Sequence, residues 1–210
     1  MLDVTLVPVL NDNYAYILQS GSAVAVLDPG EAAPVIHKLE ELGLTPSIIF
    51  NTHHHYDHID GNKKIREKYN AEIIAPKKEQ SRIENISRGV EEGDTINFGD
   101  EAITVLETPG HTSGHVCFWF KGNKVLFSGD TLFAMGCGRL FEGTAEQMFQ
   151  NFKRFNDMPD ETAIYCGHEY TQDNGRFCLS VDPDNPALIK RMKEVETIRN
   201  NKKPTIPSLM

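Results

Sequence analysis

Four of the eight histidines of this chain fall within one short segment, Thr52-His53-His54-His55-Tyr56-Asp57-His58. In an extended segment, alternate side chains point to the same side, so His53 and His55 can bind one metal ion while His54 points away. Asp57 and His58 follow a turn and can face the same cavity from another direction. A histidine-rich loop alone fits a solvated turn or an adventitious metal trap equally well.

Further candidate ligands follow later in the chain. They are His111 in Thr108-Pro109-Gly110-His111-Thr112-Ser113-Gly114-His115, Asp130 in Ser128-Gly129-Asp130-Thr131, and His168 in Cys166-Gly167-His168-Glu169. Each follows or ends a predicted strand, where side chains can converge at one edge of a sheet. This set contains imidazoles and carboxylates but no obligatory thiolate. It therefore favours a site for two metal ions of borderline hardness that share a bridging ligand, and it disfavours a closed, cysteine-rich zinc site. The absence of a His-Glu-x-x-His pattern disfavours a zincin-type protease.

The elements that must position these residues are short. Apolar runs and turn residues predict strands at 4–8, 14–18, 23–27, 47–51, 95–98, 102–107, 116–120, 124–128 and 163–166, and helices at 34–42, 61–69, 145–155 and 186–200. Two strand-rich halves with outer helices indicate a layered αβ sandwich, and the hairpin-like spacing argues against a wholly parallel sheet.

Composition narrows the function. The chain has 210 residues, 40% of them hydrophobic, with 21 Lys and Arg against 30 Asp and Glu, a net charge of −9. This balance argues against a nucleic-acid or anionic-membrane binder, because phosphate binding needs a basic face. No apolar run approaches the roughly 20 residues of a membrane span. The N-terminus lacks signal-peptide features, and four cysteines are too few for a disulfide scaffold, so we expect a reduced, cytoplasmic compartment.

The His-x-His-x-Asp-His motif with the later His, Asp and His resembles the metallo-β-lactamase superfamily. Two further segments, Gly136-Cys137-Gly138-Arg139-Leu140-Phe141-Glu142-Gly143-Thr144 and Cys166-Gly167-His168-Glu169-Tyr170-Thr171, resemble its glyoxalase II family more specifically. The resemblance implies an α+β fold, a four-layer αβ/βα sandwich with a short C-terminal helical segment. It places a catalytic domain at 1–170 and a truncated or short substrate-binding segment at 171–210, where relatives continue through further helices.

The resemblance also implies a set of ligands and a reaction. His53, His55 and His111 would hold one metal ion, Asp57, His58 and His168 the second, and Asp130 would bridge them. Zinc is the first expectation for both divalent ions, with iron or manganese as alternatives. A metal-bridging hydroxide, oriented by Asp57, would attack S-2-hydroxyacylglutathione thioesters and convert S-D-lactoylglutathione to glutathione and D-lactate.

Substrate contacts are expected from Arg139, Phe141 and Tyr170, which the family motifs place beside the thioester. We expect a monomer that acts on a small glutathione thioester without nucleic-acid or membrane partners. Three alternatives stay open. The first is a hydrolase of the same fold that acts on a lactone, a β-lactam or RNA. The second is a mono-iron persulfide dioxygenase, and the third is a non-catalytic metal-binding protein. The set of seven ligands disfavours the mono-iron dioxygenase, and the acidic net charge disfavours a nuclease.

Overall fold

Alternating side chains on each strand explain the layers of the fold. The computed structural model describes residues 1–210. On strand β2 (Asn13–Ser20), Tyr16 and Leu18 join the largest apolar cluster, whereas Ala15 and Ile17 join a second cluster on the opposite face. Successive side chains of a strand point to opposite faces of its sheet, so each central strand contributes to two apolar layers.

Two six-stranded mixed sheets form the body. The first contains, in spatial order, β1 (Leu2–Val9), β2, β3 (Ala23–Leu27), β4 (Ile48–Phe50), β5 (Glu72–Pro76) and β6 (Arg88–Val90). Neighbours from β1 to β3 are antiparallel, and those from β3 to β6 are parallel. Parallel strands need crossover connections, and helices supply two of them here.

The second sheet has a related arrangement. Its order is β14 (Ser208–Leu209), β13 (Ala163–Cys166), β10 (Val125–Gly129), β9 (Val116–Phe120), β8 (Glu101–Glu107) and β7 (Thr95–Phe98). Each pair of neighbouring strands from β7 to β10 is antiparallel, and β13 is parallel to β10. A separate two-stranded ribbon consists of β11 (Leu132–Phe133) and β12 (Gly136–Cys137).

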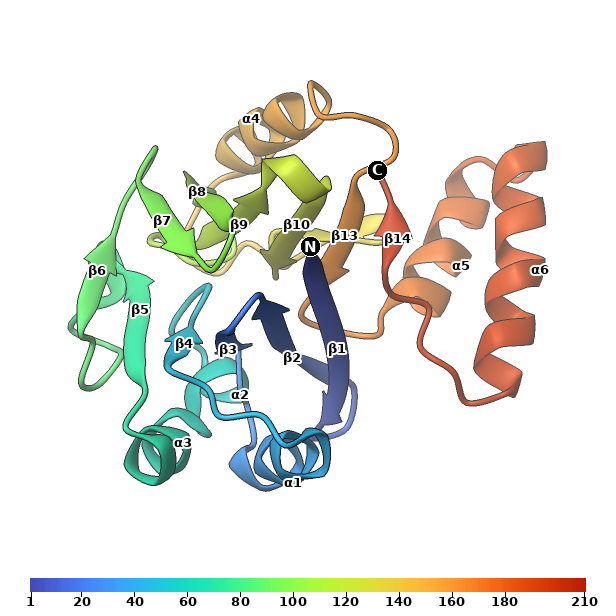
Figure 1. Ribbon diagram of the computed structural model, residues 1–210. Helices are drawn as coiled ribbons and strands as arrows, with labels where there is room; N and C mark the ends of the chain where they lie inside the picture. The colour runs from blue at the N-terminus through green and yellow to red at the C-terminus, as the bar shows by residue number, and fades with distance from the viewer.

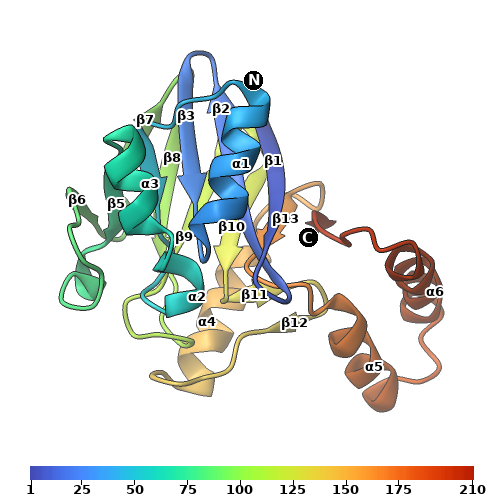
Figure 2. The same cartoon turned by 90° about the horizontal axis from the view of Figure 1, so that it is seen from below.

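Helices cover both outer faces (Figure 1). Helices α1 (Ala32–Leu42) and α3 (Asn62–Tyr69) pack on the first sheet through Val35, Leu39 and Ile65. Helix α4 (Ala145–Phe155) packs on the second sheet through Phe155, and Thr144 and Gln147 form a capping box at its start. Helices α5 (Thr171–Val181) and α6 (Pro186–Asn200) pack together at one side of the body (Figure 2).

The predicted α+β, four-layer sandwich is therefore confirmed, and each predicted strand and helix is present with small shifts in its ends. Gly43 ends α1 in the left-handed region with φ of 66°, as its position after the apolar pattern indicates. The structure adds β5, β6, the β11–β12 ribbon and the final strand β14, which were not predicted. The turn expected before Asp57 and His58 is instead a one-turn helix, α2 (Tyr56–Ile59). None of the helices combines the length and apolar character that crossing a bilayer requires.

Candidate metal centre

The seven predicted ligands lie after the carboxyl ends of strands, at one edge of the two sheets. His53 and His55 follow β4, and His111, Asp130 and His168 follow β8, β10 and β13. Strands β8 and β10 run in the same direction because each is antiparallel to β9, so their carboxyl ends share an edge. Helix α2 carries the remaining two ligands, Asp57 and His58.

Three imidazoles form the first group of potential ligands. His53, His55 and His111 have ring nitrogens within 4.8 Å of one another. His55 Nδ1 lies 3.0 Å from His53 Nε2 and 3.0 Å from His111 Nε2. His54 points away, as the alternation of an extended segment predicts, and its Nδ1 lies 2.5 Å from Glu79 Oε2.

Asp57, His58 and His168 form the second group, again with ligand atoms within 4.8 Å. Asp130 lies between the two groups: its Oδ1 is 3.4 Å from His58 Nε2, and its Oδ2 is 3.3 Å from both His111 Nε2 and His168 Nε2. The seven side chains therefore form two neighbouring groups with one carboxylate between them.

Hydrogen bonds on the outer side of the site orient four of these histidines. His111 Nδ1 donates to the Arg139 carbonyl at 2.8 Å, His58 Nδ1 to Asp28 at 3.1 Å, and His168 Nδ1 to Asp12 at 2.8 Å. His53 Nδ1 lies 3.0 Å from Thr52 Oγ1, which itself donates to Asp28 Oδ2 at 2.6 Å. A proton on Nδ1 leaves the lone pair of Nε2 free for a metal ion in these four histidines, whereas His55 turns its Nδ1 toward the other two rings of its group.

Sequence reasoning anticipated only part of this outer shell. Asp28 stands in an Asp-Pro-Gly turn with φ of 48°, and its carboxylate contacts His58. Asp12 was missed, since Asn11-Asp12-Asn13 indicates only the turn between two strands. His115 helps to fix the loop that carries Asp130, because its Nε2 accepts the backbone N–H of Asp130 at 3.1 Å. It belongs to neither group of ligands.

The buried polar atoms of the site indicate whether its residues are suited to bind metal ions. His58 Nε2 and Asp130 Oδ1 are buried and have no hydrogen-bond partner. Leaving such groups unpaired is costly, and binding a cation would satisfy both. Five imidazoles and two carboxylates suit divalent zinc, iron or manganese better than calcium or magnesium, which prefer oxygen ligands. The residues therefore fit a pair of divalent metal ions.

The two groups differ in their electrostatics. Burial lowers the pKa of His53 well below its usual value and that of His55 to about 4, so these rings are neutral near pH 7. Burial also disfavours the charged form of His58, but Asp130 and Asp28 outweigh it and raise its pKa well above the usual value. The first group thus presents free imidazoles, whereas the second combines imidazoles with carboxylates.

Close approach of the backbone makes the centre compact. A Cβ atom at Gly167 would overlap Asp130 Oδ1 and lie 2.6 Å from His58 Cε1. Only glycine therefore fits beside ligand His168 without displacing two other ligands.

A cavity of about 390 Å³ opens beside the ligands, and the predicted substrate residues Arg139, Phe141 and Tyr170 line it. The ring of Tyr170 stacks on His168 with centroids 4.6 Å apart, and the ring of Phe141 lies 5.2 Å from that of His111. Burial, with nearby carboxylates, raises the pKa of Tyr170 to about 12, so its hydroxyl remains a hydrogen-bond donor near neutral pH.

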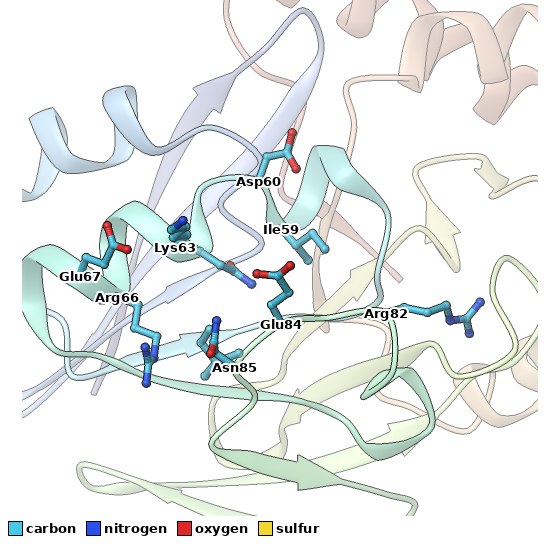
Figure 3. Close-up of a pocket in the computed structure, with 10 residues that line it drawn as sticks. Ile59, Asp60, Lys63, Arg66, Glu67, Arg82, Glu84 and Asn85 are labelled. Atoms are coloured by element: carbon cyan, nitrogen blue, oxygen red, sulfur yellow. The ribbon is translucent and has the colours of Figure 1, made fainter.

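A second cavity, of about 340 Å³, lies beside α2 and α3 (Figure 3). Its lining mixes acidic and basic side chains: Asp60, Glu67 and Glu84 with Lys63, Arg66 and Arg82. None of these residues belongs to the metal-ligand groups.

Fold and site together define an αβ/βα sandwich with a divalent-metal centre between its two halves. In agreement, the family profile described as Metallo-beta-lactamase superfamily matches residues 9–168, and that described as Hydroxyacylglutathione hydrolase C-terminus matches residues 169–210. A Rhodospirillum rubrum protein named hydroxyacylglutathione hydrolase is 46% identical over 211 residues, covering 100% of this chain and 82% of the relative.

Solved structures support the same class. The BLEG-1 B3 metallo-beta-lactamase superposes with a TM-score of 0.73 at 25% identity, over 80% of this chain and 91% of that chain. TTHA1623, solved in a di-iron-bound form, superposes with a TM-score of 0.68 at 27% identity, over 77% of this chain and 90% of that chain. The chain belongs to the metallo-β-lactamase superfamily and, within it, to the hydroxyacylglutathione hydrolase (glyoxalase II) family.

Proposed function

We propose that this protein hydrolyses S-2-hydroxyacylglutathione thioesters, converting S-D-lactoylglutathione to glutathione and D-lactate. The observation that carries the proposal is the pair of ligand groups with Asp130 between them, set beside a cavity lined by Arg139, Phe141 and Tyr170. The Rhodospirillum rubrum relative is named hydroxyacylglutathione hydrolase, which supports this substrate. The sequence motifs that single out Arg139 and Tyr170 come from the same family.

In this proposal, His53, His55 and His111 would hold one divalent ion, Asp57, His58 and His168 would hold the other, and Asp130 would be shared between the two groups. When bound, such ions supply Lewis acidity and lower the pKa of water to about 7. We propose zinc as the metal, with iron or manganese as alternatives, because imidazole and carboxylate ligands accept all three.

The protein's own residues have three tasks. Asp57 would accept a hydrogen bond from the attacking water and orient it, and Asn13 holds this carboxylate by donating to Oδ2 at 2.9 Å. The Tyr170 hydroxyl would donate to the peptide part of the substrate, and the Arg139 guanidinium would pair with its carboxylate. Phe141, whose side chain is largely exposed at the mouth of the cavity, would pack against the acyl group.

The bond changes are those of thioester hydrolysis. The water oxygen bonds to the carbonyl carbon, the carbon–sulfur bond breaks, and sulfur leaves as the glutathione thiolate. A thiolate is a good leaving group, so the reaction needs no strong general acid. The cavity lining agrees with this requirement, since Asp57 and Asp130 are its only carboxylates and both belong to the ligand groups.

We further propose that residues 1–170 form the catalytic unit and that residues 171–210 help to bind the glutathione part. Helix α5 contacts the ribbon beside the cavity, because Asn174 Nδ2 donates to the Ala134 carbonyl at 3.1 Å. A monomeric state, a cytoplasmic location and the absence of nucleic-acid and membrane partners stay predictions. Light scattering on the purified protein tests the first of them.

A substrate panel tests the proposed function. Metal-loaded protein is assayed with S-D-lactoylglutathione, a lactone and a β-lactam, and oxygen uptake is followed with glutathione persulfide. We expect the thioester to give the highest kcat/KM by orders of magnitude and no oxygen uptake. Fully metallated protein that turns over the lactone or β-lactam but not the thioester would refute the substrate assignment.

A further inference from the structure

A buried carboxylate outside the ligand groups joins two of the loops that carry them. The side chain of Glu79, at the end of the short 3-10 helix η1 (Lys77–Glu79), is completely buried. Its Oε1 accepts from Thr112 Oγ1 at 2.7 Å and from the Gly114 backbone N–H at 3.0 Å, just after ligand His111. Its Oε2 lies 2.5 Å from His54 Nδ1, between ligands His53 and His55.

Arg82 extends this connection toward the cavity. Its Nη2 lies 2.8 Å from Glu79 Oε2, and its Nη1 lies 2.5 Å from Glu142 Oε1. Figure 3 shows the Arg82 side chain directed away from Asp60 and Glu84, which line the second cavity. The buried Glu79 carboxylate places a negative charge beside the planar guanidinium, which can pair with a second carboxylate at the same time.

Glu142 belongs to the loop that carries the proposed substrate residues. Its Oε2 accepts the Ser113 backbone N–H at 2.7 Å. The neighbouring Gly143 N–H donates to the Gly110 carbonyl at 2.9 Å, and the Arg139 carbonyl accepts from His111 Nδ1 at 2.8 Å. The segment from Arg139 to Gly143 is therefore fixed at its two ends, with Phe141 between these fixed points.

We propose that Arg82, acting through Glu79 and Glu142, is a positioning residue that sets the Arg139–Gly143 loop against the first ligand group and thereby tunes thioester binding. The inference rests on the proposed function. An isolated pair at this exposure would contribute little, because solvent screens it and the side chains are mobile. Here Arg82 lies beside the buried Glu79 carboxylate, and Glu142 accepts the Ser113 backbone N–H, so the ion pair between Arg82 and Glu142 is pre-organised.

The role predicts a defined kinetic signature. Arg82 contacts none of the seven ligands, and the loop residues it positions would bind substrate in the ground state and in the transition state alike. Loss of such uniform binding raises KM and leaves kcat nearly unchanged. Metal content should also be unchanged, whereas a general structural defect would lower metal content, kcat and thermal stability together.

The test uses the full-length, metal-loaded protein and the variants Arg82→Met, Glu142→Gln, the double variant and Arg82→Lys. Arg154→Met is the matched control, because Arg154 also joins two segments, donating to the Glu107 carbonyl at 2.8 Å and pairing with Glu92. The readouts are kcat and KM for S-D-lactoylglutathione, the Kd of the non-hydrolysable S-methylglutathione, metal per chain and Tm.

We expect Arg82→Met and Glu142→Gln each to raise KM and the S-methylglutathione Kd about tenfold, with kcat within about twofold. The double variant should be no worse than the single variants, and Arg82→Lys should be intermediate, since lysine lacks the planar fork that pairs with two carboxylates. Arg154→Met should keep the wild-type KM.

Two results would overturn the inference: variants whose KM matches that of Arg154→Met, or effects that multiply in the double variant to about a hundredfold. Failure of the proposed function is recognised separately. A metal-loaded wild type that neither hydrolyses the thioester nor binds S-methylglutathione would remove the proposed function and this inference with it. A wild type that does both while the variants keep its KM would remove only the role of Arg82.

Discussion

The two-sheet body and the helical pair α5–α6 are held in place by different means. In the body, central strands bury side chains on both faces, and Phe118, Phe127 and Ile17 are almost completely buried. Helix α6 buries only Val195, and Phe177 and Val181 of α5 are each 69% exposed. Apolar burial thus defines the region that carries the proposed metal ligands, while the helical pair depends on fewer contacts.

Polar contacts connect the pair to the body. Glu169, next to the proposed ligand His168, accepts from Tyr14 Oη at 2.6 Å and from the Thr205 backbone N–H at 2.8 Å. At the crossing of the two helices, a Cβ atom on Gly175 would overlap Met192 Sδ. Changes in the helical pair should therefore affect substrate binding before they affect the proposed metal centre or the stability of the body.

The largest effect should follow loss of a proposed ligand. His58→Ala removes an imidazole from the second group, together with its contacts to the buried carboxylates of Asp28 and Asp130. Turnover should fall to background and metal per chain should drop, as measured by metal analysis and thioester hydrolysis on one sample. The control is His37→Ala on the exposed face of α1, which should behave as wild type. Full turnover by His58→Ala would contradict the proposed centre.

A pair of phenylalanine substitutions compares the two regions directly. Phe118→Ala opens a cavity between the sheets and should lower the free energy of unfolding by about 3–5 kcal/mol. Phe177→Ala on the exposed face of α5 should change it by less than about 0.5 kcal/mol. Urea unfolding at fixed metal concentration measures both values. Equal losses would show that the helical pair is as tightly packed as the body.

A smaller effect is expected at the connection between the regions. Glu169→Gln keeps the shape of the side chain but replaces one acceptor oxygen with a donor, facing either Thr205 or Tyr14. The free energy of unfolding should fall by about 1–3 kcal/mol, and proteolysis between residues 200 and 206 should become faster. Glu146→Gln, which changes an exposed residue of α4, is the control. An unchanged proteolysis rate would remove the proposed anchoring role of Glu169.

The smallest effect concerns pH. Although burial acts in the opposite direction, hydrogen bonds from Ser113 and Arg82 lower the pKa of Glu142 from 4.5 to about 2. A lowered folded-state pKa stabilises the protein above the unfolded value, and this stabilisation disappears as pH falls from about 4.5 toward 2. Because Glu142 is partly exposed, we expect less than about 1 kcal/mol. The Tm difference between metal-free wild type and metal-free Glu142→Gln should shrink across this window, and a constant difference would contradict the assignment.

Local patterns predict much of the fold and most of the site, for physical reasons. Strands such as β9 and helices such as α4 can be predicted from the sequence because the spacing of their apolar residues matches their periodicity. The proposed ligands His53, His111 and His168 can be predicted because each follows a predicted strand. Partners distant in sequence have no such local signal. Asp12 meets His168 across 156 positions, and Glu79 meets Thr112 across 33. The short strands β6 and β14 were missed because three or two residues carry almost no periodicity.

Metal titration shows whether the two ligand groups act as one hydrolytic centre. Metal-free protein is titrated with zinc while bound metal per chain and S-D-lactoylglutathione turnover are measured on the same samples. We predict that turnover rises with occupancy up to two ions per chain, and that it depends on the second. Full turnover at one ion per chain, or no turnover at two, would contradict this account.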